Sequence, residues 1–249
     1  ETVILVDEAQ DSYHDTDLWN TIVKGCGFFR TDIKMCFFAH YGDPQFAVEH
    51  PIPFTPERFN GPLHVTLTPW PGMFSPFSPD IGLFYTESEF REVVTRLPMF
   101  MSADDFAVDD AAMDYLYKLT SAHPGVVTAV VGVLYREHRD LIKQGKIHTI
   151  TMDHVLEVLK DKSRFFGSLM QYAAGRSFPD HHDSTFTSKV VDVLGQILAK
   201  GSMPFDINDV AMRTCYERGW AHRTFEKYTS KGYNLLREVL VLPSRMHEM

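Results

Sequence analysis

The sequence of 249 residues lacks any uninterrupted apolar segment approaching the roughly 20 residues that a membrane-spanning helix requires. It also lacks internal repeats and low-complexity tracts. Its content of 44% apolar and 23% charged residues is that of a globular protein. We therefore expect a folded protein with a large core and no membrane association, and the composition excludes disordered and collagen-like chains.

Cysteine is scarce, with only Cys26, Cys36 and Cys215, at unrelated spacings. Three cysteines without paired spacing exclude a disulfide scaffold and give no zinc-binding pattern. A reducing compartment is the simpler interpretation, so we expect the protein to be intracellular, in the cytoplasm or the nucleus. Secretion of a full-length form stays open as an alternative.

Positive charge is in deficit, because 24 Lys and Arg face 33 Asp and Glu, which gives a net charge of −9. An acidic chain has no overall electrostatic attraction for nucleic acid. The last third nevertheless holds a local basic group, formed by Arg213, Arg218, His222, Arg223, Lys227 and Lys231. We interpret this group as a solvated helical face, with DNA binding as the alternative.

A phosphate-binding loop is also absent, since no Gly-x-x-x-x-Gly-Lys-Ser/Thr occurs. The backbone amides and the lysine of that loop hold a triphosphate. Tight binding of ATP by this chain alone is therefore not expected. The chain starts at Glu1 with an apolar run directly after it, and we interpret it as a fragment whose amino-terminal half is missing.

Apolar runs and a helical pattern alternate at the start of the chain. The continuous run Val3–Val6 is typical of a strand buried on both faces of a parallel sheet. Residues 16–24 predict a helix that begins at a Thr16 cap. Its apolar face is formed by Leu18, Trp19, Ile22 and Val23. Residues 35–39 predict a second buried strand, so the order strand, helix, strand predicts an α/β fold.

A helical pattern begins after residue 85. Thr86 and Glu89 have the spacing of a capping box, and Pro98 is expected to end that helix. Three more helices are predicted, over residues 109–121, from Pro124 onwards and over residues 151–160.

The last third predicts two or three helices followed by a β-hairpin. An apolar stripe ends at Gly201 and is formed by Val190, Val191, Leu194, Ile197 and Leu198. Asp206 or Asn208 is expected to cap the next helix, and the run Val239–Leu242 predicts a strand. This order resembles a winged-helix module.

Two carboxylates, Asp7 and Glu8, follow directly after the first predicted strand. Ligands of open α/β sheets bind at the carboxyl ends of the strands. An Asp there can hold Mg²⁺ beside nucleotide phosphates, and the neighbouring Glu can deprotonate an attacking water. This is the Walker B arrangement of P-loop ATPases, and the alternative is a strand that ends in solvated acids.

Several short motifs occur in a fixed order over nearly the whole sequence. They are Asp7-Glu8-Ala9-Gln10, Leu18-Trp19, Tyr41-Gly42-Asp43-Pro44, Leu83-Phe84, Glu89-Phe90, Ala122-His123-Pro124-Gly125, Gly219-Trp220-Ala221-His222 and Pro243-Ser244-Arg245-Met246-His247. In this order they resemble the P-loop ATPase region of the crinkler (CRN-like) proteins of fungi and oomycetes. The sequence departs from that family in lacking the phosphate-binding loop and in having His40 before the Tyr-Gly turn.

The resemblance implies ATP and Mg²⁺ as cofactors of the intact protein, with Asp7 on the metal and Glu8 as the group that activates water. It also implies that His40 and Tyr41 lie near the γ-phosphate and that His123 and Pro124 contact nucleotide from a lid. The alternatives are a packed turn at His40 and Tyr41, and a plain helix start at His123 and Pro124.

The predicted fold class is therefore α/β, with a partial P-loop sheet over residues 1–97, a helical lid over 98–162 and a winged-helix-like domain over 163–249. The predicted function is nucleotide-dependent switching by an ATPase that is inactive without the phosphate-binding loop. One alternative is a degenerate, non-catalytic interaction module that binds a protein partner through its carboxy-terminal domain. Another is a superfamily-one helicase-like ATPase acting on nucleic acid, because Gly42-Asp43-Pro44-Gln45 resembles a turn of that class.

Overall fold

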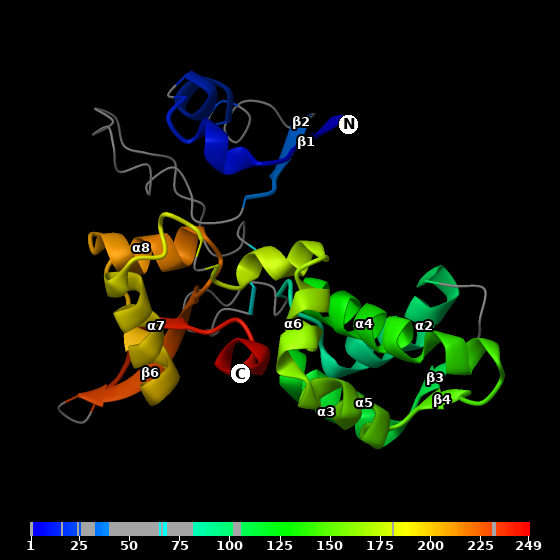
Figure 1. The fold of residues 1–249 in the computed structure, drawn as a ribbon. Helices are drawn as coiled ribbons and strands as arrows, with labels where there is room; N and C mark the ends of the chain where they lie inside the picture. The colour runs from blue at the N-terminus through cyan, green and yellow to red at the C-terminus, as the bar shows by residue number, and fades with distance from the viewer. Residues whose placement is uncertain are drawn as a thin grey trace.

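The computed structural model describes residues 2–15, 17–23, 25, 33–39, 65, 67–68, 82–101, 106–180, 182–230 and 233–249. Figure 1 shows three groups of elements: a pair of strands with short helices near the amino terminus, a helical body, and a carboxy-terminal group of helices and strands. The fold is therefore mixed α/β, which confirms the predicted class in this general form.

The amino-terminal group is built on two parallel strands, β1 (Thr2–Val6) and β2 (Ile33–Phe37). The parallel pairing predicted from the two apolar runs is confirmed. After β1 the chain forms a 3-10 helix, η1 (Ala9–Ser12), and a π-helical segment, η2 (Leu18–Val23). Trp19 of η2 packs on Phe37 with ring centroids 4.9 Å apart. The indole therefore fixes η2 against one face of the strand pair.

On the other face of the strand pair, apolar side chains are exposed. Val3 is 58% exposed and Leu5 is 67% exposed, so the prediction of a strand buried on both faces is wrong. The physical reason is that, within the described residues, only the face with Met35 and Phe37 has a covering layer, and β1 pairs with β2 alone. Ile22 was also predicted to face the core and is 50% exposed, because η2 winds as a π-helix rather than an α-helix.

The helical body surrounds one long helix. Its elements are α2 (Glu87–Met101), β3 (Ala107–Val108), α3 (Asp110–Thr120), α4 (Pro124–Lys143), β4 (Thr149–Ile150), α5 (Met152–Lys160), α6 (Lys162–Leu169) and η5 (Ala173–Ser177). The three helices predicted after residue 100 are confirmed. α4 is buried over almost its whole first half, and α2, α3, α5, α6 and η5 all pack against it.

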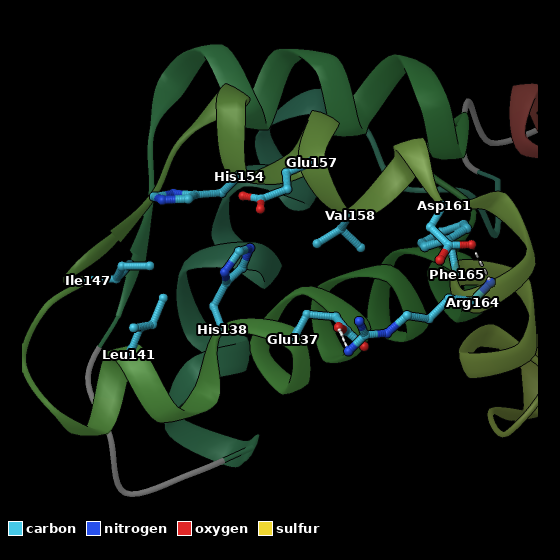
Figure 2. A pocket seen from close by; sticks show the side chains of 10 residues that line it. All are labelled: Glu137, His138, Leu141, Ile147, His154, Glu157, Val158, Asp161, Arg164 and Phe165. Carbon is cyan, nitrogen blue, oxygen red and sulfur yellow. Dashed lines mark hydrogen bonds and ion pairs between the residues drawn. The ribbon is translucent and has the colours of Figure 1, made fainter.

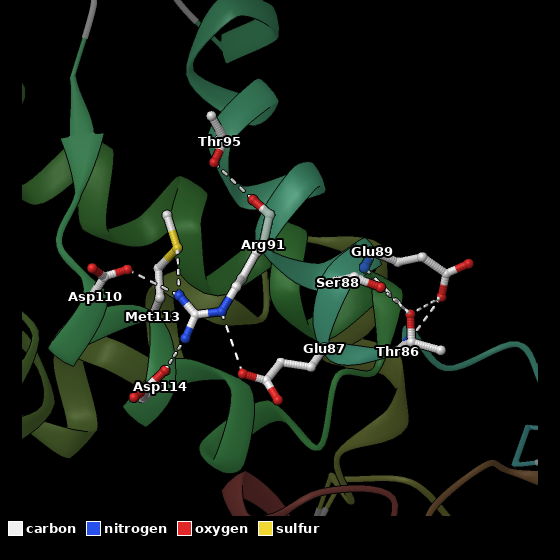
Figure 3. A network of polar contacts seen from close by, with 9 residues as sticks. All are labelled: Thr86, Glu87, Ser88, Glu89, Arg91, Thr95, Asp110, Met113 and Asp114. Carbon is white, nitrogen blue, oxygen red and sulfur yellow. Dashed lines mark hydrogen bonds and ion pairs between the residues drawn. The ribbon is translucent and has the colours of Figure 1, made fainter.

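Short sequence motifs determine where the helices of this body begin. Thr86 and Glu89 form the predicted capping box, in which the Thr86 N–H donates to Glu89 Oε2 at 2.8 Å and the Glu89 N–H donates to Thr86 Oγ1 at 3.3 Å (Figure 3). The predicted end of this helix at Pro98 is wrong, because α2 continues to Met101. A proline this near the carboxyl end removes a single backbone bond, and the Pro98 ring is buried.

Arg91 joins α2 to α3. Its guanidinium contacts Glu87 on its own helix, and Asp110 and Asp114 on α3, as Figure 3 shows. The N–O distance to Asp110 is 3.0 Å. The arginine side chain is 34% exposed, so each ion pair by itself adds little to the free energy of unfolding. Together the ion pairs fix the angle at which the two helices cross.

The carboxy-terminal group has its own core. It consists of α7 (Ser188–Lys200), β5 (Met203–Pro204), α8 (Val210–Glu217), β6 (His222–Ser230) and β7 (Tyr233–Val241). The strands form an antiparallel sheet in the order β5-β7-β6, which confirms the predicted strand at Val239–Leu242 and its hairpin. Ile197, Cys215, Trp220 and Leu240 are buried between the helices and the sheet.

Two details of this group differ from prediction. The α8 cap is Asp209, whose side chain accepts the backbone N–H of Ala211 at 2.8 Å, rather than Asp206 or Asn208. Asp206 instead binds the backbone N–H of Asn208 and forms the turn that leads into the helix. The predicted stripe on α7 is only partly buried, since Val191 and Leu198 are about half exposed. Gly201 ends α7 as predicted, with φ 80°.

The last turn of the chain, η6 (Arg245–Glu248), connects the carboxy-terminal group to the helical body. Met246 is 1% exposed and belongs to the core of the helical body rather than to the core around Trp220. η6 packs against α3, and Figure 1 shows it beside the helical body. The chain end therefore links the core of the carboxy-terminal group to the core of the helical body.

We predict opposite effects for two Gly→Ala substitutions. A Cβ at Gly175 would meet the Met170 Cα at 2.6 Å, so Gly175→Ala is expected to destabilise the protein by about 1–3 kcal/mol. The control is Gly195, in the exposed surface of α7, where nothing lies within 4 Å of the added carbon. Gly195→Ala is expected to stabilise by about 0.5–1 kcal/mol. Chemical denaturation measures both changes, and equal effects would contradict the packing around η5.

Candidate functional site

The acid pair lies at the carboxyl end of β1, where the sequence predicted it. Asp7 and Glu8 are both exposed. Asp7 Oδ1 accepts the backbone N–H of Glu8 at 3.0 Å, and Gln10 Nε2 donates to Glu8 Oε2 at 2.5 Å. The chain next to the pair is anchored to the end of β2, because the Ala9 N–H donates to the Phe38 carbonyl at 2.9 Å. The two carboxylates are therefore held at the end of a parallel strand pair.

Glu8 has a backbone conformation that few residues adopt. Its φ is 51° and its ψ is 40°, in the left-handed region that favours glycine. The next residue, Ala9, is buried and bonded to Phe38, which holds the turn in place. Non-glycine residues in this region cost about 1 kcal/mol and gather at functional sites. The backbone strain at Glu8 is therefore consistent with a functional role for the turn that exposes this side chain to solvent.

Two carboxylates match what Mg²⁺ takes from a protein in nucleotide sites, where water and phosphate oxygens complete its octahedron. Within the described ranges, no group of three or more His, Cys, Asp or Glu side chains is arranged for a metal ion. The pair alone therefore offers a partial ligand set. His40 and Tyr41, predicted to sense the γ-phosphate, lie outside the described residues, as does the Gly42–Gln45 turn.

His123 and Pro124 begin α4, as predicted. Pro124 is the first helical residue, and His123 Nδ1 accepts the backbone N–H of Val126 at 3.4 Å. Burial lowers the pKa of His123. Its ring packs on Phe84 with centroids 5.0 Å apart. Figure 1 places α4 well apart from β1 and β2, so the structure does not bring His123 and the acid pair together.

The structure instead gathers two other histidines near His123. His222, at the start of β6, packs edge-on against the same Phe84 ring, with centroids 5.8 Å apart. His247 of η6 also lies close enough to His123 and His222 for their charges to lower its pKa. Sequence reasoning missed this cluster and assigned His222 to a solvated basic face, whereas His222 is 8% exposed. Only the three-dimensional fold joins residues so far apart in the chain.

The rest of the predicted basic face is largely neutralised. Arg213 lies 3.9 Å from Glu217, Arg218 lies 3.8 Å from Asp183, and Arg223 lies 3.6 Å from Glu238, measured between nitrogen and oxygen. Lys231 lies outside the described residues. The described part of this surface therefore mixes charges of both signs.

A separate pocket of about 330 Å³ lies between α4, α5 and α6 (Figure 2). Arg164 pairs with Glu137 along one wall at 2.5 Å. His138 and His154 lie on the other side with ring centroids 4.9 Å apart, and His138 Nε2 is buried without a hydrogen-bond partner in the part of the chain that the structure describes. Asp7, Glu8, His123 and Pro124, the predicted functional residues that the structure describes, do not line this pocket.

No protein-family model, no curated protein and no solved structure matches this chain. None of the helices in the described ranges combines the length and the apolar character needed to cross a membrane.

The free cysteines of the described chain are Cys36, which is exposed, and Cys215, which is buried. Burial raises the pKa of Cys215 to about 12, so this thiol is inert at neutral pH.

We predict that Asp7→Asn leaves the melting temperature within about 2 °C of the parent protein. The acceptor oxygen for the Glu8 N–H survives in the amide, and a neutral group beside Glu8 removes a repulsion. If Asp7 held the fold through its charge, the melting temperature would fall instead. The control is Asp209→Asn, which keeps the α8 cap but removes its negative charge at the helix start, and is expected to lower the melting temperature slightly.

Proposed function

We propose that this chain is the Walker B half of a crinkler-like P-loop ATPase whose bound nucleotide sets its conformation. The observation that carries the proposal is the position of Asp7 and Glu8 at the carboxyl end of a strand that pairs in parallel with the next strand along the chain. Asp7 positions Mg²⁺, and Glu8 orients and deprotonates the attacking water.

The local geometry supports these two roles. Both side chains are exposed, so nucleotide and metal have access to them. Phosphoryl transfer depends on positioning and charge stabilisation rather than on covalent chemistry by the protein. A carboxylate held by a constrained turn, as Glu8 is, keeps its position without the metal.

Two further parts belong to the proposal. His123 and Pro124 contact the nucleotide from the helical lid, because the positive end of the dipole of a helix favours an anion. His40 and Tyr41 sense the γ-phosphate. The carboxy-terminal group is the winged-helix-like module. Two helices that pack on the antiparallel β5-β7-β6 sheet support this interpretation.

A non-catalytic interaction module is the second candidate. The observation that favours it is apolar surface left open in two places. Val3 and Leu5 are exposed on β1, and Met99 and Phe100 at the end of α2 are 74% and 83% exposed. Large exposed apolar side chains that lie close together mark interaction surfaces. This candidate requires neither Mg²⁺ nor a reactive Glu8.

We predict that the purified chain of 249 residues does not turn over ATP. The sequence has no phosphate-binding loop, so nothing holds the β- and γ-phosphates in line with the water that Glu8 would activate. A phosphate-release assay is expected to read background for the parent and for Glu8→Gln alike. Turnover that Glu8→Gln abolishes would contradict the prediction and reveal another phosphate cradle.

A binding experiment separates the two candidate functions. Mn²⁺ at millimolar concentration, added with ATP as a paramagnetic substitute for Mg²⁺, is expected to broaden the backbone amide signals of residues 7–9. Asp7→Asn is expected to abolish the broadening, whereas Asp192→Asn, an exposed acid on α7, leaves it intact. Broadening that is absent, or that survives in Asp7→Asn, would refute the metal-binding role and favour the interaction module.

A further inference from the structure

Three histidines from separate parts of the chain, of which His222 is buried and the other two are partly buried, meet where the chain end joins the helical body. They are His123 at the start of α4, His222 at the start of β6 and His247 in η6. His123 belongs to the helical body, His222 to the carboxy-terminal group, and His247 to η6, the segment that connects the two. The cluster therefore lies at the junction that Met246 fastens by inserting into the helical core.

The rings of His123 and His222 are packed in ways that suit their neutral forms. His123 Nδ1 accepts the Val126 N–H, so a proton on that nitrogen removes the α4 cap. The charge would also stand at the positive end of the helix dipole. His222 Nδ1 is buried and has no hydrogen-bond partner among the described residues, so a protonated ring would bury an unsatisfied N–H and a charge.

His247 lies flat on Phe178, with ring centroids 4.0 Å apart and an angle of 2° between the planes. Its Nδ1 lies 2.8 Å from Ser244 Oγ and its Nε2 lies 3.3 Å from Ser177 Oγ. Two hydroxyls satisfy the ring without offering it a negative charge. Ser177 belongs to η5 of the helical body, so this contact crosses the junction.

Among the described residues, no carboxylate is one of the causes that shift the pKa values of these three histidines. The charged groups that affect the pKa values of the cluster are the histidines themselves: His123 acts on His222 and His247, and His222 acts on His247. Other charged side chains on the same short segments are Arg176, Arg245 and Glu248, and Arg223 follows His222. Within the described residues, none of these four is among the causes of the shifts.

We propose that His123, His222 and His247 form a pH-operated latch that holds the carboxy-terminal group against the helical body while the rings are neutral and releases it when they are protonated. The latch depends on the junction described above and not on the proposed ATPase function. Because each added proton repels the others at short range, protonation of one ring makes the remaining contacts less stable.

The direction of the pH dependence follows from the pKa values. Burial, with a smaller contribution from His123, lowers the pKa of His222 to about 4, and burial with the neighbouring histidines lowers that of His247 to about 3. In the released form these rings regain ordinary values near 6.5. The released form thus binds more protons below pH 6.5, and for His222 the latched form loses about tenfold in relative population for each pH unit from 6.5 down to about 4.

The test is a pH titration of the full chain from 7.5 to 4.5 by small-angle X-ray scattering, with helix content followed by circular dichroism. We expect the radius of gyration to rise below pH 6.5 while the helix content is retained. No increase down to pH 4.5, or a loss of helix content in step with the expansion, would overturn the latch and show instead a stable junction or general acid unfolding.

Two variants assign the transition to the cluster. His222→Phe removes the unpartnered nitrogen, and His123→Asn keeps an N-cap acceptor without a titrating ring. Each is expected to move the midpoint of expansion to lower pH by about one unit or more, whereas the exposed His148→Gln leaves it unchanged. A midpoint unchanged in His123→Asn would overturn the proposal even if His222→Phe failed to fold.

Discussion

The buried helix α4 constrains the arrangement of the whole helical body. Residues 129–134 are buried without interruption, so this helix has no solvent face over more than one turn. A helix that is apolar all round has to be covered on every side. α2, α3, α5, α6 and η5 supply that cover, and Arg91 fixes the crossing of α2 and α3 outside it. The pocket between α4, α5 and α6 is a place where the cover is incomplete.

Sequence reasoning succeeded where the signal is local. The Thr86 capping box, the Pro124 start of α4 and the Gly201 end of α7 each depend on residues within four positions of one another. The α8 cap was missed by one position, because Asp206, Asn208 and Asp209 all offer cap chemistry and only tertiary packing selects among them. The Pro98 stop failed because a proline in the last turn costs a helix little.

Sequence reasoning failed where the outcome depends on distant parts of the chain. The apolar run at Val3–Val6 predicted the strand but not its cover, since burial requires a second layer that no local pattern specifies. The position of the acid pair at the strand end was predicted correctly, because this position depends only on the sequence of that segment. The meeting of His123, His222 and His247 spans more than a hundred residues, so spacing could not reveal it; the one available hint was the abundance of 12 histidines.

The open face of β1 has a consequence for how the chain behaves at high concentration. Exposed Val3 and Leu5 lie on a strand that pairs on one edge only within the described residues, and such strands invite pairing between molecules. The net charge of −9 opposes this through mutual repulsion, which salt screens over about 10 Å at 0.1 M. Colloidal stability of the chain is thus a balance between attraction through the exposed apolar strand β1 and long-range charge repulsion, and ionic strength decides which of the two prevails.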